Sequence, residues 1–71
     1  MRDPRVDPRP GDVLIEPRLY GGGIRIRREV DRVRDGVVSW VVGQFGYDID
    51  LAGWRRMNAY ADVVHAGEEE E

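Results

Sequence analysis

Cysteine, lysine and threonine are all absent from this chain of 71 residues. Without cysteine the protein can form neither a disulfide nor a thiolate metal site, and the sequence carries no record of a redox compartment. One histidine, His65, is too few for a multi-histidine metal site within a single chain. We therefore expect no bound metal and no cofactor.

Long apolar runs are also missing. A membrane-spanning helix needs about 18 or more consecutive apolar residues, and a signal peptide needs an apolar core behind a basic start. The sequence has neither, so we expect a cytoplasmic protein with no membrane segment. A chain of this length forms one domain, near the lower size limit at which a hydrophobic core is stable without disulfides or metals.

Nucleophilic side chains are scarce. Nucleophilic catalysis needs a nucleophile, a base and a group that orients the base. The chain offers one serine, Ser39, in an apolar stretch, and one histidine near the C-terminus. Asp48 and Asp50 lie close together, but a turn residue and a helix N-cap explain them more simply. We expect a protein that is not an enzyme and has no catalytic residues.

All eleven basic residues are arginines, and they face fourteen acidic residues, for a net charge of −3. Glu68 to Glu71 supply four of the acidic charges, so residues 1–67 hold eleven arginines and ten acids, a net +1. A net charge this small gives no general attraction toward nucleic acid. Nucleic-acid binding would therefore need a local patch of arginines.

The two ends of the chain differ in composition from its middle. Residues 1–10 hold three of the four prolines, which remove amide donors and prevent helix or inner strand, so they predict a disordered, charged arm. Residues 67–71 predict a disordered acidic tail, which leaves 11–66 as the domain. Glycines 21–23 lack the helix, lysine and hydroxyl residue of a phosphate-binding loop, and therefore predict a hairpin loop.

The stretch 36–43 is the strongest strand in the chain, because it is rich in valine, holds a tryptophan and has glycine at both ends. Asp35 and Gly36 precede it as the residue pair typical of a two-residue hairpin turn. The turn pairs it with a long strand over 24–34, and places Val33 opposite Val38 and Asp31 opposite Trp40.

The apolar residues of the 24–34 strand do not keep a constant alternation. Ile24, Ile26 and Val30 share one parity, whereas Val33 has the other, so one extra residue must interrupt the strand. We predict a β-bulge within residues 29–32, which would also increase the local twist.

The two faces of the 36–43 strand are both apolar. We predict that Val38, Trp40 and Val42 face the core, because tryptophan has the largest area to bury. Val37 and Val41 then form a second apolar face. In so small a protein, this second face needs cover from another element or from a partner.

Three further strands and one helix complete the expected fold. The strands cover residues 12–16, 45–49 and 61–65. A short helix over 51–58 begins at Asp50, a good N-cap, and ends at Asn58 in the left-handed conformation. Gly53 inside this helix costs about 1 kcal/mol relative to alanine. The sequence thus predicts a mainly β protein, a small SH3-like five-stranded barrel with one short helix before the last strand.

Three segments carry a resemblance to a known group of proteins. They are Asp7-Pro8-Arg9-Pro10-Gly11-Asp12-Val13-Leu14, Val33-Arg34-Asp35-Gly36-Val37-Val38-Ser39-Trp40 and Asp50-Leu51-Ala52-Gly53-Trp54-Arg55-Arg56-Met57. They resemble small uncharacterised phage and prophage proteins with an SH3-like barrel, in which a "PGDVL" strand opens the chain and an "SLAAWRRW"-like turn precedes the last strand. Asp50 replaces the serine and Met57 the second tryptophan. The resemblance implies a fold and a phage-derived origin, and no activity.

Three kinds of partner remain open. The first hypothesis is a phage- or prophage-derived accessory protein that binds a host or phage protein through Val37, Val41, Tyr20 and Tyr47. The alternative is a nucleic-acid binder with an arginine-rich sheet face. The arginines of that face are Arg25, Arg27, Arg32, Arg34, Arg55 and Arg56. The third is a homodimer formed through the second face of the central strand.

Overall fold

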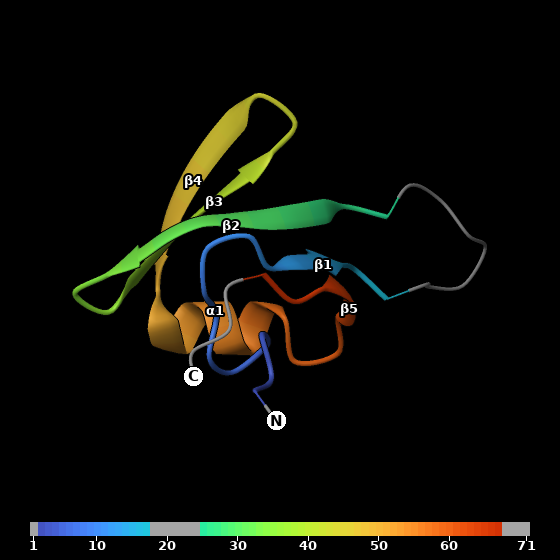
Figure 1. The fold of residues 1–71 in the computed structure, drawn as a ribbon, viewed down its shortest axis with the longest axis horizontal. Coiled ribbons are helices and arrows are strands. Elements are labelled where there is room, and N and C mark those ends of the chain that lie inside the picture. Colours follow the sequence, from blue (N-terminus) through green and yellow to red (C-terminus); the bar gives the residue numbers. More distant parts are fainter. Residues whose placement is uncertain (1, 18–24, 68–71) are drawn as a thin grey trace.

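The computed structural model describes residues 2–17 and 25–67, and these form one sheet of five antiparallel strands with one short helix (Figure 1). In chain order the elements are β1 (Val13–Ile15), β2 (Arg27–Arg34), β3 (Val37–Val42), β4 (Phe45–Asp50), α1 (Leu51–Met57) and β5 (Asp62–His65). The strand order across the sheet is β4-β3-β2-β1-β5. The prediction of a mainly β protein with a helix before the last strand is confirmed.

The sheet does not close into a barrel. β4 and β5 are its two edges, and the pairings among the described strands do not join them. α1 lies beneath the sheet and connects the two edges along the chain (Figure 1). Within the described residues no helix is long and apolar enough to cross a membrane, since α1 has seven residues.

The hairpin of β2 and β3 confirms the predicted turn. Asp35 and Gly36 both have positive φ, 54° and 76°, as a two-residue turn of this kind requires. Arg34 then pairs with Val37, and Val33 with Val38. The turn residues therefore set the register of the central strand pair.

The predicted β-bulge is also present. The register of β2 against β3 shifts between Val30 and Arg32. The predicted pairing of Asp31 with Trp40 is wrong, because the bulge takes Asp31 out of the ladder and places Val30 opposite Trp40. With this shift Val30 becomes a fully buried core residue, while Val33 still packs against the core.

The core lies between the sheet and α1. Leu14, Val30, Val38, Trp54 and Ala61 are all 1% exposed or less, so one side chain from each of β1, β2, β3 and α1 meets in a single cluster. The predicted core face of β3 is confirmed for Val38 and for Trp40, which packs partly buried against the same cluster. The remaining partly buried members are Val33, Ile49, Leu51 and Met57.

Residues 2–10 differ from the expected disordered arm. Pro4 and Pro8 are buried, and the Pro4 carbonyl accepts a hydrogen bond from the Trp54 indole nitrogen at 3.1 Å. The Val6 carbonyl accepts another from Arg55 Nε at 2.8 Å. Prolines cannot join a helix or an inner strand, but their carbonyls still accept, so this segment packs along α1. The expected glycine loop and residues 68–71 of the expected tail lie outside the described residues.

α1 begins as predicted and ends differently. The Asp50 side chain accepts a hydrogen bond from Gly53 N at 2.8 Å, which confirms the N-cap. The predicted left-handed conformation of Asn58 is wrong, since its φ is −107°. The buried Asn58 side chain instead donates to the Trp54 carbonyl at 3.0 Å and so ends the helix without a glycine.

Asp12 holds both ends of the described chain to the sheet. Its buried carboxylate accepts bonds from Arg2 at 2.5 and 3.0 Å, from Arg9 N at 2.8 Å and from Gly67 N at 2.6 Å. Burial raises the pKa of a carboxyl group, but these four bonds outweigh it and hold the pKa of Asp12 below its ordinary value.

Replacing Asp12 with asparagine (Asp12→Asn) removes this buried charge and with it the ion pair between Asp12 and Arg2. We expect the free energy of unfolding at pH 7, measured by urea denaturation, to fall by about 3 kcal/mol. Because the folded pKa is lowered, the stabilisation is present above the ordinary carboxyl pKa of about 4 and is lost as the pH falls through the folded value. The wild type should therefore lose more stability on acidification than the variant.

Asp7→Asn is the matched control, because Asp7 is an exposed neighbour that pairs with Arg9 at 3.5 Å. We expect it to change stability by less than about 0.5 kcal/mol. Equal effects of the two substitutions would contradict the role of Asp12.

Gly53 provides a second test, because it lies where a helix would ordinarily favour alanine. A Cβ atom at Gly53 would lie 2.7 Å from Asp50 Oδ1 and 2.7 Å from Ile49 Cγ1. We expect Gly53→Ala to lower the free energy of unfolding by about 1 kcal/mol, since crowding outweighs helix propensity. The exposed neighbour is the control: Ala52→Gly should also cost about 1 kcal/mol, through propensity alone. A higher melting temperature for Gly53→Ala would contradict the crowding.

Candidate functional site

The hairpin of β3 and β4 projects from the rest of the fold and runs away from α1, so that its turn is the end of the hairpin furthest from the helix (Figure 1). Its two strands pair without a register shift, from Val37 opposite Asp50 to Val42 opposite Phe45. Alternate residues of a strand point to opposite faces. The hairpin therefore has an inner face, continuous with the core, and an outer face directed away from the helix.

The part of the inner face nearest the β3–β4 turn consists of aromatic side chains. Trp40 and Tyr47 lie opposite each other, and their rings stack with centroids 4.6 Å apart. Phe45 lies two residues before Tyr47 and so shares its face. Phe45 is 61% exposed and Tyr47 48% exposed. We call Trp40, Phe45 and Tyr47 the aromatic ledge; it joins the core at Trp54, whose ring centroid is 6.2 Å from that of Trp40.

A buried arginine supports the ledge. Arg28 Cζ lies 5.5 Å from the Trp40 ring centroid, within range of a cation–π interaction. Its guanidinium also pairs with Glu16 Oε2 at 2.8 Å and donates to Asn58 Oδ1 at 3.3 Å. Glu16, which follows β1, and Asn58, which follows α1, therefore hold the guanidinium of Arg28 against Trp40. The partly buried indole is fixed on one side by Arg28 and contacts Tyr47 in a stack.

Sequence reasoning did not identify Arg28. The available indication was parity, because Arg28 falls on the same side of β2 as Ile26 and Val30, which were expected to face the core. Ile26 is 39% exposed, whereas Arg28 is only 6% exposed. Arg28 is therefore the buried residue on this side, whereas the sequence favoured Ile26. The long apolar stem of arginine allows it to be buried there.

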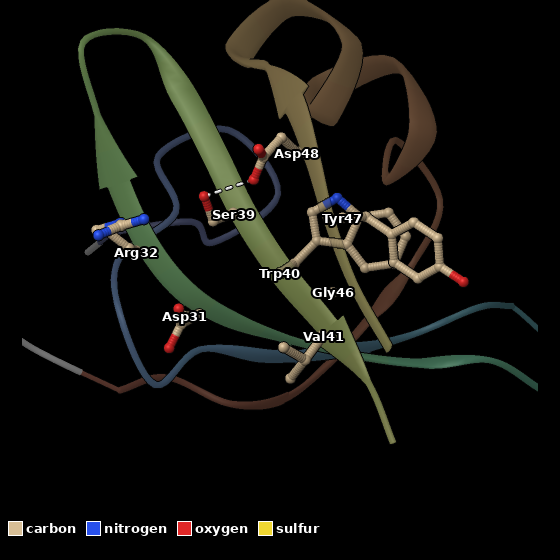
Figure 2. A pocket seen from close by; sticks show the side chains of 8 residues that line it. All are labelled: Asp31, Arg32, Ser39, Trp40, Val41, Gly46, Tyr47 and Asp48. Atoms are coloured by element: carbon tan, nitrogen blue, oxygen red, sulfur yellow. Dashed lines mark hydrogen bonds between the residues drawn. The ribbon is translucent and has the colours of Figure 1, made fainter. Parts of the chain in front are cut away.

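The outer face carries a hollow of about 300 Å³ over the middle of the hairpin. Gly46 and Val41 lie opposite each other there, and Ser39 donates a hydrogen bond to Asp48 Oδ1 at 2.8 Å. Asp31 and Arg32 of the bulge border it from β2 (Figure 2). In the same view the rings of Trp40 and Tyr47 lie together, away from these β2 side chains. Trp40 and Tyr47 also contribute to the lining of the hollow, which has an apolar centre and a charged rim.

The residues predicted for protein binding do not form one surface. Val37, which is 39% exposed, and the half-buried Val41 lie on the outer face, whereas Tyr47 lies on the inner face. Tyr20 lies outside the described residues. α1 covers the inner face of the sheet, so Val37 on the outer face remains exposed.

The predicted arginine face is divided. Arg27, Arg32 and Arg34 are exposed on β2, on the side opposite Arg28, while Arg55 and Arg56 lie on α1. The two groups therefore lie on opposite sides of the sheet.

Several of these arginines also form ion pairs with acidic residues or donate hydrogen bonds to backbone carbonyls. Arg25 donates to the Glu16 carbonyl at 2.7 Å and forms an ion pair with Asp62. Arg34 is 3.9 Å from Asp35. Glu29 and Asp31 are exposed among the arginines of β2. The described residues therefore offer no continuous basic surface.

Comparison of the chain with protein-family models, with curated proteins and with solved structures finds no match. The function must therefore be argued from the geometry of the hairpin itself.

The support of Trp40 by Arg28 can be tested with a charge-conserving substitution. Arg28→Lys keeps the positive charge but cannot stack on Trp40 and bind both Glu16 and Asn58. We expect a loss of about 1 to 2 kcal/mol in the free energy of unfolding. The control is Arg27→Lys, one residue away on the exposed face, which should cost less than about 0.5 kcal/mol. Equal stabilities for the two variants would contradict the supporting role.

Proposed function

We propose that this chain is a small, non-enzymatic protein-binding module that recognises an extended segment of a partner protein through the aromatic ledge. The observation that carries the proposal is the ledge itself. It places two strongly exposed aromatic side chains on one face of a projecting hairpin, beside a half-buried tryptophan.

The composition of the ledge suits a binding surface. Tyrosine, tryptophan, phenylalanine and arginine are enriched in protein interfaces, and tyrosine, tryptophan and arginine are enriched among the residues that contribute most of the binding energy. Solvent-exposed aromatic area on the free protein is unfavourable, and a partner that covers it removes that area from water. Because Tyr47 and Arg28 already hold Trp40 in place, the indole loses little side-chain entropy on binding.

The strand order supports an SH3-like assignment of the fold, as an open variant. β5 lies beside β1, the next three strands follow as a meander, and a helical turn precedes β5. The sequence resemblance supports a phage or prophage origin, which we include in the proposal. With that origin, the partner is a host or phage protein.

Nucleic acid is the less favoured partner. Binding to phosphates needs several cations on one surface, and the exposed arginines are divided between two sides of the sheet with acids among them. The outer face of β3, the interface of the homodimer hypothesis, keeps Val37 exposed, but Val37 and the half-buried Val41 offer less apolar area than the ledge.

A panel of linear random peptides, each about twelve residues and so long enough to lie along a strand, can test the proposal. We expect selection on the folded chain to enrich peptides with apolar residues. The double variant Phe45→Ser/Tyr47→Ser should bind them at least about tenfold more weakly, because it removes the exposed rings of the ledge. Binding is measured by fluorescence anisotropy, and folding is checked by circular dichroism.

Val37→Ser is the matched control, since it removes an exposed apolar side chain from the outer face of the same hairpin. Its affinity should stay within about twofold of the wild type. If Val37→Ser abolishes binding and the ledge variant does not, the outer face is the site. If no peptide is enriched, the protein-binding proposal is overturned.

A further inference from the structure

Nothing among the described residues explains why position 46 is a glycine. It lies inside β4, where glycine weakens a strand because it adds entropy to the unfolded chain and packs nothing. The positive-φ glycines of the described residues are Gly11, Gly36 and Gly43, so Gly46 does not need left-handed backbone freedom. Apart from its two chain neighbours, a Cβ atom at Gly46 would meet no atom of the described residues within 4 Å. A glycine with no such cause is typical of a place where a ligand or another backbone approaches closely.

The missing side chain of Gly46 opens the outer hollow toward Val41. Two carboxylates, Asp31 and Asp48, and one guanidinium, Arg32, border this space (Figure 2). Ser39 occupies only Oδ1 of Asp48, and Oδ2 has no partner among the described residues. The excess of negative charge favours a basic side chain whose aliphatic stem lies on Val41.

β4 is also an edge strand, whose free side pairs with no other described strand. It ends the sheet, five of its six residues are exposed, and its pairing with β3 contains no bulge. Proteins usually protect such edges with charged side chains, lysine above all, or with proline, a bulge or a covering element. β4 holds neither lysine nor proline, and its charged residues are Asp48 and Asp50, which disfavour an acidic neighbour and not a basic one. Amide groups alternate in direction along an antiparallel ladder. Since Phe45 adjoins the two-residue turn and pairs with Val42, the groups of Gly46 and Asp48 face the free edge.

We propose that the free edge of β4 binds an extended peptide of alternating basic and apolar residues as an added strand. The apolar side chains of the peptide lie against Phe45 and Tyr47 of the ledge, and an arginine or lysine opposite Gly46 enters the outer hollow. Main-chain hydrogen bonds supply affinity, and the side chains on the two faces supply specificity. The inference rests on the proposed function and names the chemistry of its partner.

A second copy of the chain fits this edge less well. Two β4 strands paired edge to edge would bring Asp48 and Asp50 of both copies onto one outer face without adding a basic residue from β4. Like charges that face each other across strands are destabilising. A basic peptide supplies the opposite charge.

The first probe is a capped seven-residue peptide of alternating valine and arginine, compared with one of alternating valine and glutamate. We expect the arginine peptide to bind the full chain at least about tenfold more tightly. Asp48→Asn should weaken its binding several-fold. Asp35→Asn, which removes an exposed acid in the β2–β3 turn where asparagine tolerates a positive φ, should leave binding unchanged.

The second probe tests strand addition directly. Two N-methylated versions of the arginine peptide are made, one on the arginine amides and one on the valine amides. An added strand directs only alternate amides toward its neighbour, so one version should lose binding and the other should keep it. Loss with the arginine set indicates an antiparallel strand, and loss with the valine set a parallel one. Equal affinities for the two versions would overturn strand addition.

Gly46→Thr separates binding from folding. Threonine favours strands, so the variant should be at least as stable as the wild type while it fills the hollow and weakens binding of the arginine peptide. Unchanged binding would overturn the role of the hollow. If random peptides bind through the ledge but the arginine peptide does not bind, this inference fails and the proposed function stands; if no peptide binds, both fail. A dimer that the arginine peptide disrupts would assign the edge to a second copy and overturn the inference.

Discussion

The fold depends on the buried carboxylate of Asp12. A core built around five fully buried apolar side chains is small, and its largest member, Trp54, donates its indole N–H to Pro4 of the segment that packs along α1. Asp12 holds that segment through Arg2 and Arg9, and its own main chain pairs with Val30, the core residue of β2. One polar group thus connects the cover, the sheet and Gly67 near the other end of the described chain.

This dependence marks the limit of what the sequence could predict. The Asp35-Gly36 turn, the bulge in β2, the core face of β3 and the Asp50 cap all follow from residues close together in sequence, and local patterns predicted them correctly. The packing of residues 2–10 depends on contacts with residues 50 or more positions away, such as those of Pro4 with Trp54 and of Arg5 with Ala61. A proline-rich, charged composition indicates a mobile arm when only local preferences are considered. Composition alone does not predict that the Pro4 carbonyl binds Trp54 or that the Arg2 guanidinium binds the buried Asp12.

The candidate site shows the same division. Tyr47 was identified from its pattern, but its stack on Trp40 and the support from Arg28 depend on which strands pair and where a bulge falls. Valines on the outer face looked like the binding surface because apolar residues there lacked an internal partner. The structure shows a larger exposed apolar area on the inner face, next to the core. Arginines adjacent in sequence are separated in space, because a strand sends neighbouring side chains to opposite faces and α1 lies on the side away from the outer face of β2.

The bulge at Asp31 has a consequence for how the length of this protein can vary. β2 pairs with β1 in its first half and with β3 along most of its length, and the one extra residue brings the two halves into different phase. Deleting a single residue there would restore a regular alternation and reverse the facing of every residue before it. Arg28 would then turn outward and Glu29 inward, toward the core. The number of residues in β2 therefore cannot change by one without reversing its faces. Insertions and deletions during evolution would have to fall in other segments.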